Sequence, residues 1–303
     1  MTDFIGDIHG HADKLEELLL KMGYTHRNGS YSHPERKVLF VGDYIDRGPK
    51  IRETLRIVKD MVDSGNATAL MGNHEFNAIT FHYELEGGGH LRKHLIKNMI
   101  QHYETIRQFH NRQKEYDDYI EWFKTLALFQ ETESFRAVHA GWDNQSIAFL
   151  SKTLPNGKLT DDLIYKSEKK ETELTTALEI TLRGKQITLP AGHYYEDEDG
   201  TKRNEIRVKW WKNPMQLSYS EISVDPIATL PETPVDLSLL PNADYYNHES
   251  KPVFFGHYWL RGTPVLIQQN LCCLDFSIAK NGHLAAYRFD GEKELSDSKL
   301  VYV

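Results

Sequence analysis

The sequence has little cysteine, no long apolar run and no recognisable leader. Only two of its 303 residues are cysteines, and these are neighbours, Cys272 and Cys273. Adjacent cysteines rarely pair with each other, which excludes a disulfide framework and indicates reduced thiols, as in cytoplasmic proteins. No stretch approaches the ~18 consecutive apolar residues of a membrane span, and the first residues lack the pattern of a signal peptide. We therefore expect a cytoplasmic protein outside the membrane.

The sequence also lacks an excess of positive charge. It has 36 Lys and Arg against 44 Asp and Glu, a net charge of −8. This balance argues against sequence-independent binding of duplex nucleic acid. An anionic substrate would need local positive charge, which bound metal ions can supply. The 15 histidines prompt a search for metal ligands, whereas nothing in the composition indicates an oligomeric state.

The first eighty residues alternate between apolar runs and amphipathic segments. Strands are predicted at 3–5, 38–41 and 67–71, with helices near 15–22 and 51–62 between them. This βαβαβ order is typical of a parallel sheet whose two faces are covered by helices. The sequence therefore predicts an α/β fold.

We interpret residues 1–303 as one catalytic domain with two insertions. The first, at about 82–133, is polar and helical in pattern. The second, at about 143–248, is irregular and includes a predicted hairpin turn at 197–202. Further strands are expected in the segments that flank and follow the insertions, at 135–138, 253–255, 265–267, 271–274 and 284–289.

Two features of the insertions leave alternatives open. The pair Trp210 and Trp211 could line a substrate cleft, although adjacent aromatic residues are more often part of the core. Four histidines of the first insertion have no ligand pattern and are interpreted as surface residues of a solvated helix. They are His90, His94, His102 and His110.

One turn motif contains two carboxylates and a guanidinium. The strand predicted at 38–41 is followed by Gly42-Asp43-Tyr44-Ile45-Asp46-Arg47-Gly48-Pro49. Ligands of open α/β sheets bind at the carboxyl ends of strands, where this turn would lie. A carboxylate can hold a metal ion, and the fork of Arg47 suits phosphate oxygens. Taken alone, the motif could equally be a salt-bridged turn between a strand and a helix.

The same chemistry recurs at other strand ends. Five predicted strands are each followed at once by a residue type that ligates metals, although Asp and Asn are also common in turns. Six oxygen and nitrogen ligands are about right for two ions, and a central carboxylate can bridge them. A set without thiolates suits Mn²⁺, Fe or Zn²⁺. The six residues are Asp7, His9, Asp43, Asn73, His139 and His257.

These motifs resemble those of calcineurin-like metallophosphoesterases, closest to the phosphoprotein phosphatase branch and its bacterial diadenosine tetraphosphatase relatives. The resemblance is carried by Asp7-Ile8-His9, Gly42 to Gly48, Gly72-Asn73-His74-Glu75, His139 and Gly256-His257. It implies a four-layer αββα sandwich with a dinuclear metal centre at one edge. It assigns Asp7 and His9 to one ion, Asp43 to both, and Asn73, His139 and His257 to the other.

The resemblance also implies catalytic roles. Arg47 would contact phosphate, and His74, oriented by Asp46, would protonate the leaving group. A further phosphate-binding arginine would come from the second insertion, with Arg183 and Arg207 as candidates. Many members of the wider superfamily have a second histidine two residues after the one at 257. Here the sequence is Gly256-His257-Tyr258-Trp259.

We therefore expect a phosphoesterase with two divalent metal ions, most simply Mn²⁺, that uses in-line attack by a metal-bound hydroxide. Phosphate monoesters of Ser, Thr or Tyr residues are the first substrate class to consider. Dinucleoside polyphosphates of the diadenosine tetraphosphate type are the alternative. A metal-binding interaction module without catalysis is the rival from another class, but it would not need His74, Asp46 and Arg47.

Overall fold

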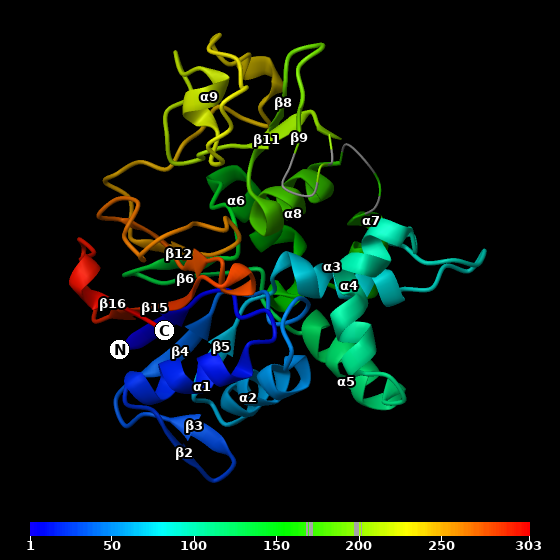
Figure 1. Ribbon diagram of the computed structural model, residues 1–303, viewed down its shortest axis with the longest axis vertical. Coiled ribbons are helices and arrows are strands. Elements are labelled where there is room, and N and C mark those ends of the chain that lie inside the picture. Colours follow the sequence, from blue (N-terminus) through cyan, green and yellow to red (C-terminus); the bar gives the residue numbers. More distant parts are fainter. Residues whose placement is uncertain (168, 170–171, 197–199, 201) are drawn as a thin grey trace.

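Two β-sheets lie face to face at the centre of the fold in the computed structural model (Figure 1). The structure describes residues 1–167, 169, 172–196, 200 and 202–303. The first sheet has six strands in the order β14-β15-β1-β4-β5, with β16 paired to β15. Their bounds are β14 (Asp275–Phe276), β15 (His283–Phe289), β1 (Thr2–Ile5), β4 (Lys37–Phe40), β5 (Ala67–Ala69) and β16 (Leu300–Tyr302).

The parallel part of this sheet is the βαβαβ unit expected from the sequence. Strands β1, β4 and β5 are parallel neighbours, connected through α1 (Ala12–Lys21) and α2 (Ile51–Asp63). Both helices bury an apolar stripe, including Leu15 of α1 and Leu55 of α2, against the sheet. Between α1 and β4 the chain forms a small antiparallel hairpin of β2 (Thr25–Arg27) and β3 (Ser30–Ser32).

The second sheet has four strands in the order β13-β12-β7-β6. They are β13 (Leu271–Cys273), β12 (Val253–Phe255), β7 (Arg136–Val138) and β6 (Phe129–Glu131). Residues 265–267, predicted as a strand, are not one, and the side chain of Val265 is exposed. Phe4 of β1 stacks on Phe254 of β12 with ring centroids 3.6 Å apart, which shows how the sheets share a core.

The outer face of the second sheet is covered by α6 (Asn144–Thr153) and by irregular chain. Trp210 and Trp211 belong to this layer, where they pack on Phe255. Both are buried, so they are core residues and the interpretation as a cleft is wrong for them. The result is a mixed α/β sandwich with the predicted layers, one of them largely irregular.

In Figure 1 the first insertion lies to the right of the two sheets, and much of the second extends above them. The first contains α4 (Ile96–Gln108) and α5 (Gln113–Lys124), which follow α3 (Asn73–His82). The second contains these further elements: η1 (Pro155–Gly157), α7 (Asp161–Ser167), α8 (Glu173–Arg183), β8 (Gln186–Thr188), β9 (Tyr195–Glu196), β10 (Lys202–Arg203), β11 (Glu205–Arg207), α9 (Tyr219–Ile222) and η2 (Leu237–Leu239). Strands β9 and β10 pair antiparallel, but most of the predicted turn at 197–202 lies outside the described residues.

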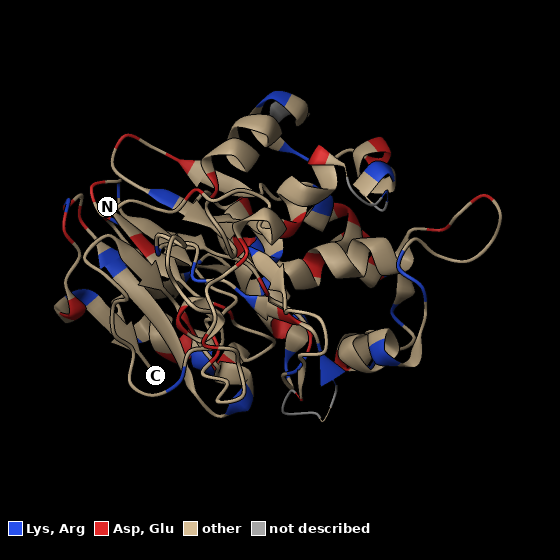
Figure 2. Cartoon of the chain, turned by 90° about the horizontal axis from the view of Figure 1, so that it is seen from above, with Lys and Arg blue, Asp and Glu red and all other residues tan. Residues whose placement is uncertain are grey.

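Charge is dispersed rather than concentrated in this fold. Viewed from above, Lys and Arg residues and Asp and Glu residues are scattered among one another over the fold (Figure 2). Within the part of the chain that the structure describes, no helix has the length and apolar character required to cross a bilayer. Cys272 and Cys273 are free, and both side chains are buried.

Candidate active site

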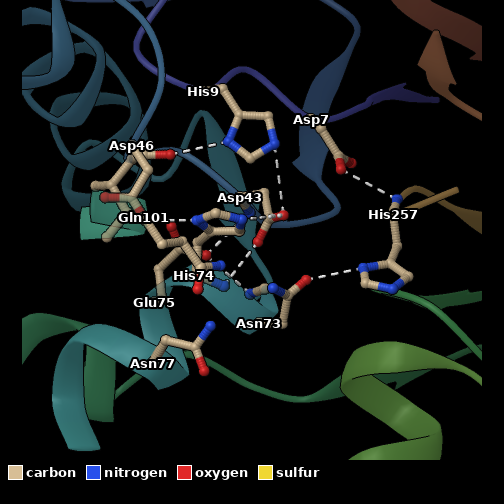
Figure 3. A network of polar contacts seen from close by, with 12 residues as sticks. Asp7, His9, Asp43, Asp46, Asn73, His74, Glu75, Asn77, Gln101 and His257 are labelled. Carbon is tan, nitrogen blue, oxygen red and sulfur yellow. Dashed lines mark hydrogen bonds and ion pairs between the residues drawn. The ribbon is translucent and has the colours of Figure 1, made fainter. Parts of the chain in front are cut away.

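The carboxyl ends of five strands bring the six predicted metal ligands together, and all of them except His139 are labelled in Figure 3. Each residue follows an apolar strand by one to four positions, so the sheets place all of them at one edge. Five of the six are buried, and His257 is partly exposed. The residues are Asp7 and His9 after β1, Asp43 after β4, Asn73 after β5, His139 after β7 and His257 after β12.

Asp43 lies between two groups of possible ligands. Its Oδ2 is 3.6 Å from Nε2 of His9, whereas its Oδ1 is 3.5 Å from Nε2 of His139. One group that could hold an ion consists of His9, Asp43 and His74, and another of Asp43, His139 and His257. Because each carboxylate oxygen faces a different group, Asp43 has the geometry of a bridging ligand.

Hydrogen bonds at Nδ1 of His9 and His139 determine which ring nitrogen can bind a metal ion. Nδ1 of His9 is 2.9 Å from the carbonyl oxygen of Ile45, and Nδ1 of His139 is 2.9 Å from that of Val41. A carbonyl can only accept a hydrogen bond, so each neutral ring carries its proton on Nδ1 and presents the lone pair of Nε2. This is the arrangement that orients histidines for metal binding.

Several acceptor atoms face one another in the site. Oδ1 of Asn73 accepts from Nδ1 of His257 at 2.8 Å, but it also lies 3.0 Å from Nε2 of His139, which carries no proton in the neutral ring that donates from Nδ1 to Val41. Oδ1 of Asp7 and Nε2 of His9 are buried and have no hydrogen-bond partner. Lone pairs that face one another in a buried site are unfavourable unless a cation lies between them. The donor set therefore fits divalent metal ions.

The electrostatics of the buried carboxyl groups agree with that fit. Burial raises the pKa of Asp7, and the nearby charges of Asp275 and Asp43 raise it further. Burial likewise raises the pKa of Glu75 to about 7, with Asp43 adding to the effect. Burial lowers the pKa of His9 to about 4, which favours the neutral ring that metals bind. Such crowded acids are stabilised in their ionised form by cations.

Two glycines allow this close packing. A Cβ at Gly72 would lie 2.2 Å from Oδ1 of Asp43, and one at Gly256 would lie 1.9 Å from Oδ1 of Asp7. Either side chain would therefore fill the space of a ligand oxygen. Asp43 itself has a φ of 55°, a left-handed conformation that is costly outside glycine and concentrated at functional sites.

His74 and Asp46 form a buried pair beside Asp43. Nδ1 of His74 is 2.5 Å from Oδ2 of Asp46, and Nε2 of His74 is 3.9 Å from Oδ2 of Asp43. Burial lowers the pKa of His74, but the charges of Asp43 and Asp46 outweigh it and raise the pKa overall. A ring that donates from Nδ1 to Asp46 carries a second proton at Nε2 in its cationic form, which the raised pKa favours, and Nε2 is the nitrogen that faces Asp43.

His102 was predicted to be a surface residue, and this prediction is wrong. Its side chain is buried, and its Nδ1 lies 2.8 Å from Oδ1 of Asp46. The Nε2 of the same ring contacts the hydroxyl of Tyr116 at 2.5 Å, and Thr105 also donates to Asp46. The sequence pattern of α4 does not indicate this role, because most of the helix is exposed and only His102 and Thr105 are buried.

Glu75 is a second residue whose role the sequence did not reveal. Its Oε2 accepts hydrogen bonds from the backbone amides of Asp43 and Gly72, each at 2.9 Å. Its Oε1 accepts one from the amide of Tyr44 at 2.8 Å. Glu75 thereby connects the turn after β4 to the start of α3, and its position next to His74 in the motif was the available signal.

The three arginines named from the sequence lie around the centre in different environments. Arg47 is exposed, with its guanidinium carbon 5.1 Å from the ring centroid of Trp259. Arg207 forms a forked pair with Asp225, at 3.1 and 2.7 Å, and donates to the carbonyl oxygen of His257. Arg183 donates to Oδ1 of Asn77 at 2.7 Å and also pairs with Glu179.

A cavity of about 550 Å³ adjoins the centre at Trp259. The Trp259 ring lines the cavity and lies 6.3 Å from the ring of His9, so the cavity comes close to the metal-ligand set. The cavity wall combines apolar residues, such as Ile227 and Leu260, with charged residues of both signs, among them Arg207, Lys280 and Asp225. Its volume lies in the range of sites that bind small molecules.

Comparisons with known proteins agree with these motifs. A family model described as calcineurin-like phosphoesterase matches residues 2–178. An asymmetrical bis(5'-nucleosyl)-tetraphosphatase of Oceanobacillus iheyensis is 32% identical over 46% of this chain and 55% of the relative. A symmetrical bis(5'-nucleosyl)-tetraphosphatase of Marinomonas sp. is 31% identical over 54% of this chain and 53% of the relative.

The similarity to these relatives is partial. The chain spans about half the length, or less, of the curated relatives that it matches.

Among solved structures, a protein serine/threonine phosphatase from Saccharomyces cerevisiae is 14% identical, with a TM-score of 0.48. That alignment covers 100% of this chain and 78% of the yeast chain.

Proposed function

The chain belongs to the calcineurin-like phosphoesterase family, and we propose that it hydrolyses dinucleoside polyphosphates at a dinuclear metal centre. The observation that carries this choice of substrate is the cavity of about 550 Å³ beside Trp259. Its apolar wall suits a nucleoside, and the ammonium group of Lys280 would contact a phosphate joined to it. The tetraphosphatase names of the sequence relatives point the same way.

The candidate ligands would hold two divalent ions, with Asp43 shared between them. Asp7 and His9 would complete one site, and Asn73, His139 and His257 the other. Mn²⁺ is the first choice, with Fe or Zn²⁺ also compatible with this nitrogen and oxygen set. When bound, the ions supply positive charge for the phosphoryl oxygens and acidify water as the nucleophile.

The residues of the chain would perform three further tasks. The exposed fork of Arg47 would bind the equatorial oxygens of the reacting phosphoryl group. His74 would deliver the proton held at Nε2 to the departing oxygen, while Asp46 fixes its ring through Nδ1. Arg183 would be the second phosphate contact. Arg207 ranks behind it, because Asp225 already engages its fork.

Hydrolysis of phosphate monoesters on Ser, Thr or Tyr residues is the second candidate. The exposure of Arg47 favours it, because a phosphorylated side chain of a protein could reach that guanidinium from solvent. A metal-binding module without catalysis fits less well, since it would not require the buried pair of His74 and Asp46. The free, buried thiols of Cys272 and Cys273 support a reducing, cytoplasmic location.

A substrate panel with Mn²⁺ tests the proposal. We expect the highest kcat/KM for diadenosine tetraphosphate among that compound, phosphoserine and phosphotyrosine peptides, nucleoside monophosphates and a phosphodiester. A preference for the phosphopeptides would replace the proposal with the second candidate. If none of these compounds is hydrolysed with Mn²⁺, Fe²⁺ or Zn²⁺, the chain is better described as a metal-binding module without catalysis.

A further inference from the structure

The helix α4 of the first insertion presents a stripe of large apolar side chains to solvent. The residues recur at every third or fourth position, which is the spacing of one face of an α-helix. They are between 38% and 78% exposed, and because they are contiguous they differ from the single exposed apolar residues of an ordinary surface. The stripe consists of Leu95 at the N-cap followed by Ile96, Met99, Ile100, Tyr103 and Ile106.

The opposite face of α4 holds the helix in place. His102 and Thr105 are its buried residues, and both contact Oδ1 of Asp46, at 2.8 and 2.5 Å. The apolar stripe is therefore carried by a helix whose other face is already fixed to the catalytic domain. Little further ordering of the backbone is needed when a partner packs on such a surface, which lowers the free-energy cost of association.

The area of the stripe is close to that of one side of a protein interface. With about 200 Å² for each side chain when fully exposed, the exposed fractions of the stripe amount to roughly 700 Å². The largest apolar patch of a typical monomer is about 300–600 Å². A stable complex buries about 800 Å² on each partner, so two such stripes would together approach the area of a standard interface.

The charges beside the stripe favour a second α4 helix in antiparallel orientation. Lys97 and Glu104 are seven residues apart, or about two turns, so they lie on the same flank of the stripe. A twofold axis between antiparallel helices places each flank against the same flank of the other copy, in the reverse direction. With the axis near Ile100, Lys97 of each copy would face Glu104 of the other. The apolar ends match as well, because Ile96 would then lie opposite Ile106.

We propose that this stripe is a homodimer interface in which two α4 helices pack antiparallel across a twofold axis near Ile100. The occupant of the surface is therefore a second copy of this chain. An anionic membrane surface suits the stripe less well, because the chain has a net charge of −8 and Glu104 lies beside the apolar residues. The interface concerns assembly and is independent of the proposed function.

Sedimentation velocity of the full chain with Mn²⁺ tests the interface. Over a concentration range of about 0.1–100 µM, we expect a reversible equilibrium between one 35.1 kDa chain and a species of twice that mass. Ile100→Glu places two like charges close to the twofold axis and should raise the Kd of the dimer about 100-fold or more. Leu20→Glu makes a similar change at an exposed leucine of α1 and should leave the Kd unchanged.

An exchange of the flanking charges tests the antiparallel orientation. Lys97→Glu and Glu104→Lys each place like charges opposite one another at both ends of the interface and should raise the Kd about 10-fold. The double variant Lys97→Glu/Glu104→Lys should return the Kd to nearly the wild-type value, because opposite charges meet again. A parallel pair of helices would not bring these two residues together, so absence of this recovery would overturn the proposed arrangement.

Two further results would contradict the homodimer. One is a chain that stays monomeric over the whole concentration range, and the other is a dimer whose Kd is the same in Ile100→Glu as in the wild-type protein. Co-sedimentation with vesicles of phosphatidylcholine and phosphatidylserine tests the membrane as occupant. Vesicle binding by a monomer that Ile100→Glu abolishes would assign the stripe to a lipid surface and overturn the proposal. Thermal unfolding confirms that each variant is folded, and the charge exchange decides the matter if Ile100→Glu is not.

Discussion

His102 contacts the carboxylate of Asp46 through Nδ1 at a distance of 2.8 Å. The other oxygen of Asp46 contacts Nδ1 of His74, so each carboxylate oxygen contacts a different histidine. Burial alone would raise the pKa of Asp46, but His102 and His74 lower it and keep the group ionised. An α4 residue, remote in sequence from the metal motifs, thereby fixes the partner of the candidate acid.

We predict that His102→Ala lowers kcat about 10- to 100-fold with little change in KM, because Asp46 would lose one of its two imidazole partners. His110→Ala, which changes an exposed residue just beyond the same helix, is the matched control. Steady-state kinetics and thermal unfolding of both variants provide the measurement. An equal fall in kcat for both, or a loss explained by unfolding alone, would contradict a positioning role.

Asp43 should matter to both metal ions. We expect chelation to abolish activity and added Mn²⁺ to restore it. Asp43→Asn should weaken both sites, because each of its oxygens faces a different histidine. Asn73→Ala should weaken mainly the site with His139 and His257. Elemental analysis and metal titration test this pair of variants, and native affinity at both sites in Asp43→Asn would exclude the bridge.

The loss of rate on replacing His74 should depend on the leaving group of the substrate. Nitrophenolate leaves with little assistance, whereas a phenolate with a pKa of about 10 depends more on a proton donor. General acid catalysis is worth about 10²–10⁴ in rate where it is needed. We predict that His74→Asn slows phenyl phosphate hydrolysis by up to that factor and p-nitrophenyl phosphate hydrolysis far less.

Arg47→Ala provides the contrast for that experiment, because phosphate binding is indifferent to the leaving group. It should lower kcat/KM for both aryl phosphates alike, and Asp46→Asn should show a weaker version of the His74 asymmetry. Metal content must be the same in all variants. If His74→Asn slows both substrates equally, the residue acts on the phosphoryl group or the nucleophile instead.

The tryptophan pair should affect stability rather than substrate choice. Trp210 is buried against Phe255 and Tyr246 behind the second sheet. Trp210→Ala should therefore reduce the free energy of unfolding by about 3–5 kcal/mol, the usual cost of such a deletion in a core. Denaturant unfolding measures the change, and an altered ranking in the substrate panel would contradict the assignment to the core.

An acid-sensitive contact joins the start of the second insertion to the segment that follows α8. Asp143 lies 3.0 Å from Nζ of Lys185 and caps α6 through the amide of Ser146. Burial alone would raise its pKa, but Lys185 and Ser146 lower it below the unfolded value. The pair therefore stabilises the fold above about pH 4 and loses that contribution as the pH falls through the folded pKa.

Asp143→Asn tests this linkage. The variant should lose stability at pH 6 and show a smaller further loss at pH 3 than the wild-type protein. Denaturant unfolding at the two pH values gives both numbers. Parallel losses in the two proteins would show that the stability of this region does not depend on the ionisation of Asp143.

The sequence by itself determined the parallel βαβαβ unit, the family and the gathering of the candidate ligands at one edge. Apolar strands followed directly by Asp7, Asp43 and Asn73 are local patterns, and parallel pairing brings such strand ends together whatever the rest of the chain does. Helix and strand periodicity and turn-forming residues are patterns among neighbours in the chain, so they can be recognised in a single sequence.

Only the tertiary structure decided the surroundings of that centre. Nothing near His102 in the sequence indicates that α4 packs its ring on Asp46, 56 positions away. The meeting of Arg92 with Arg183 at Asn77, and the burial of Trp210, likewise depend on where the insertions pack. Such contacts join segments distant in the chain and are selected by burial and charge in three dimensions, which no short-range pattern records.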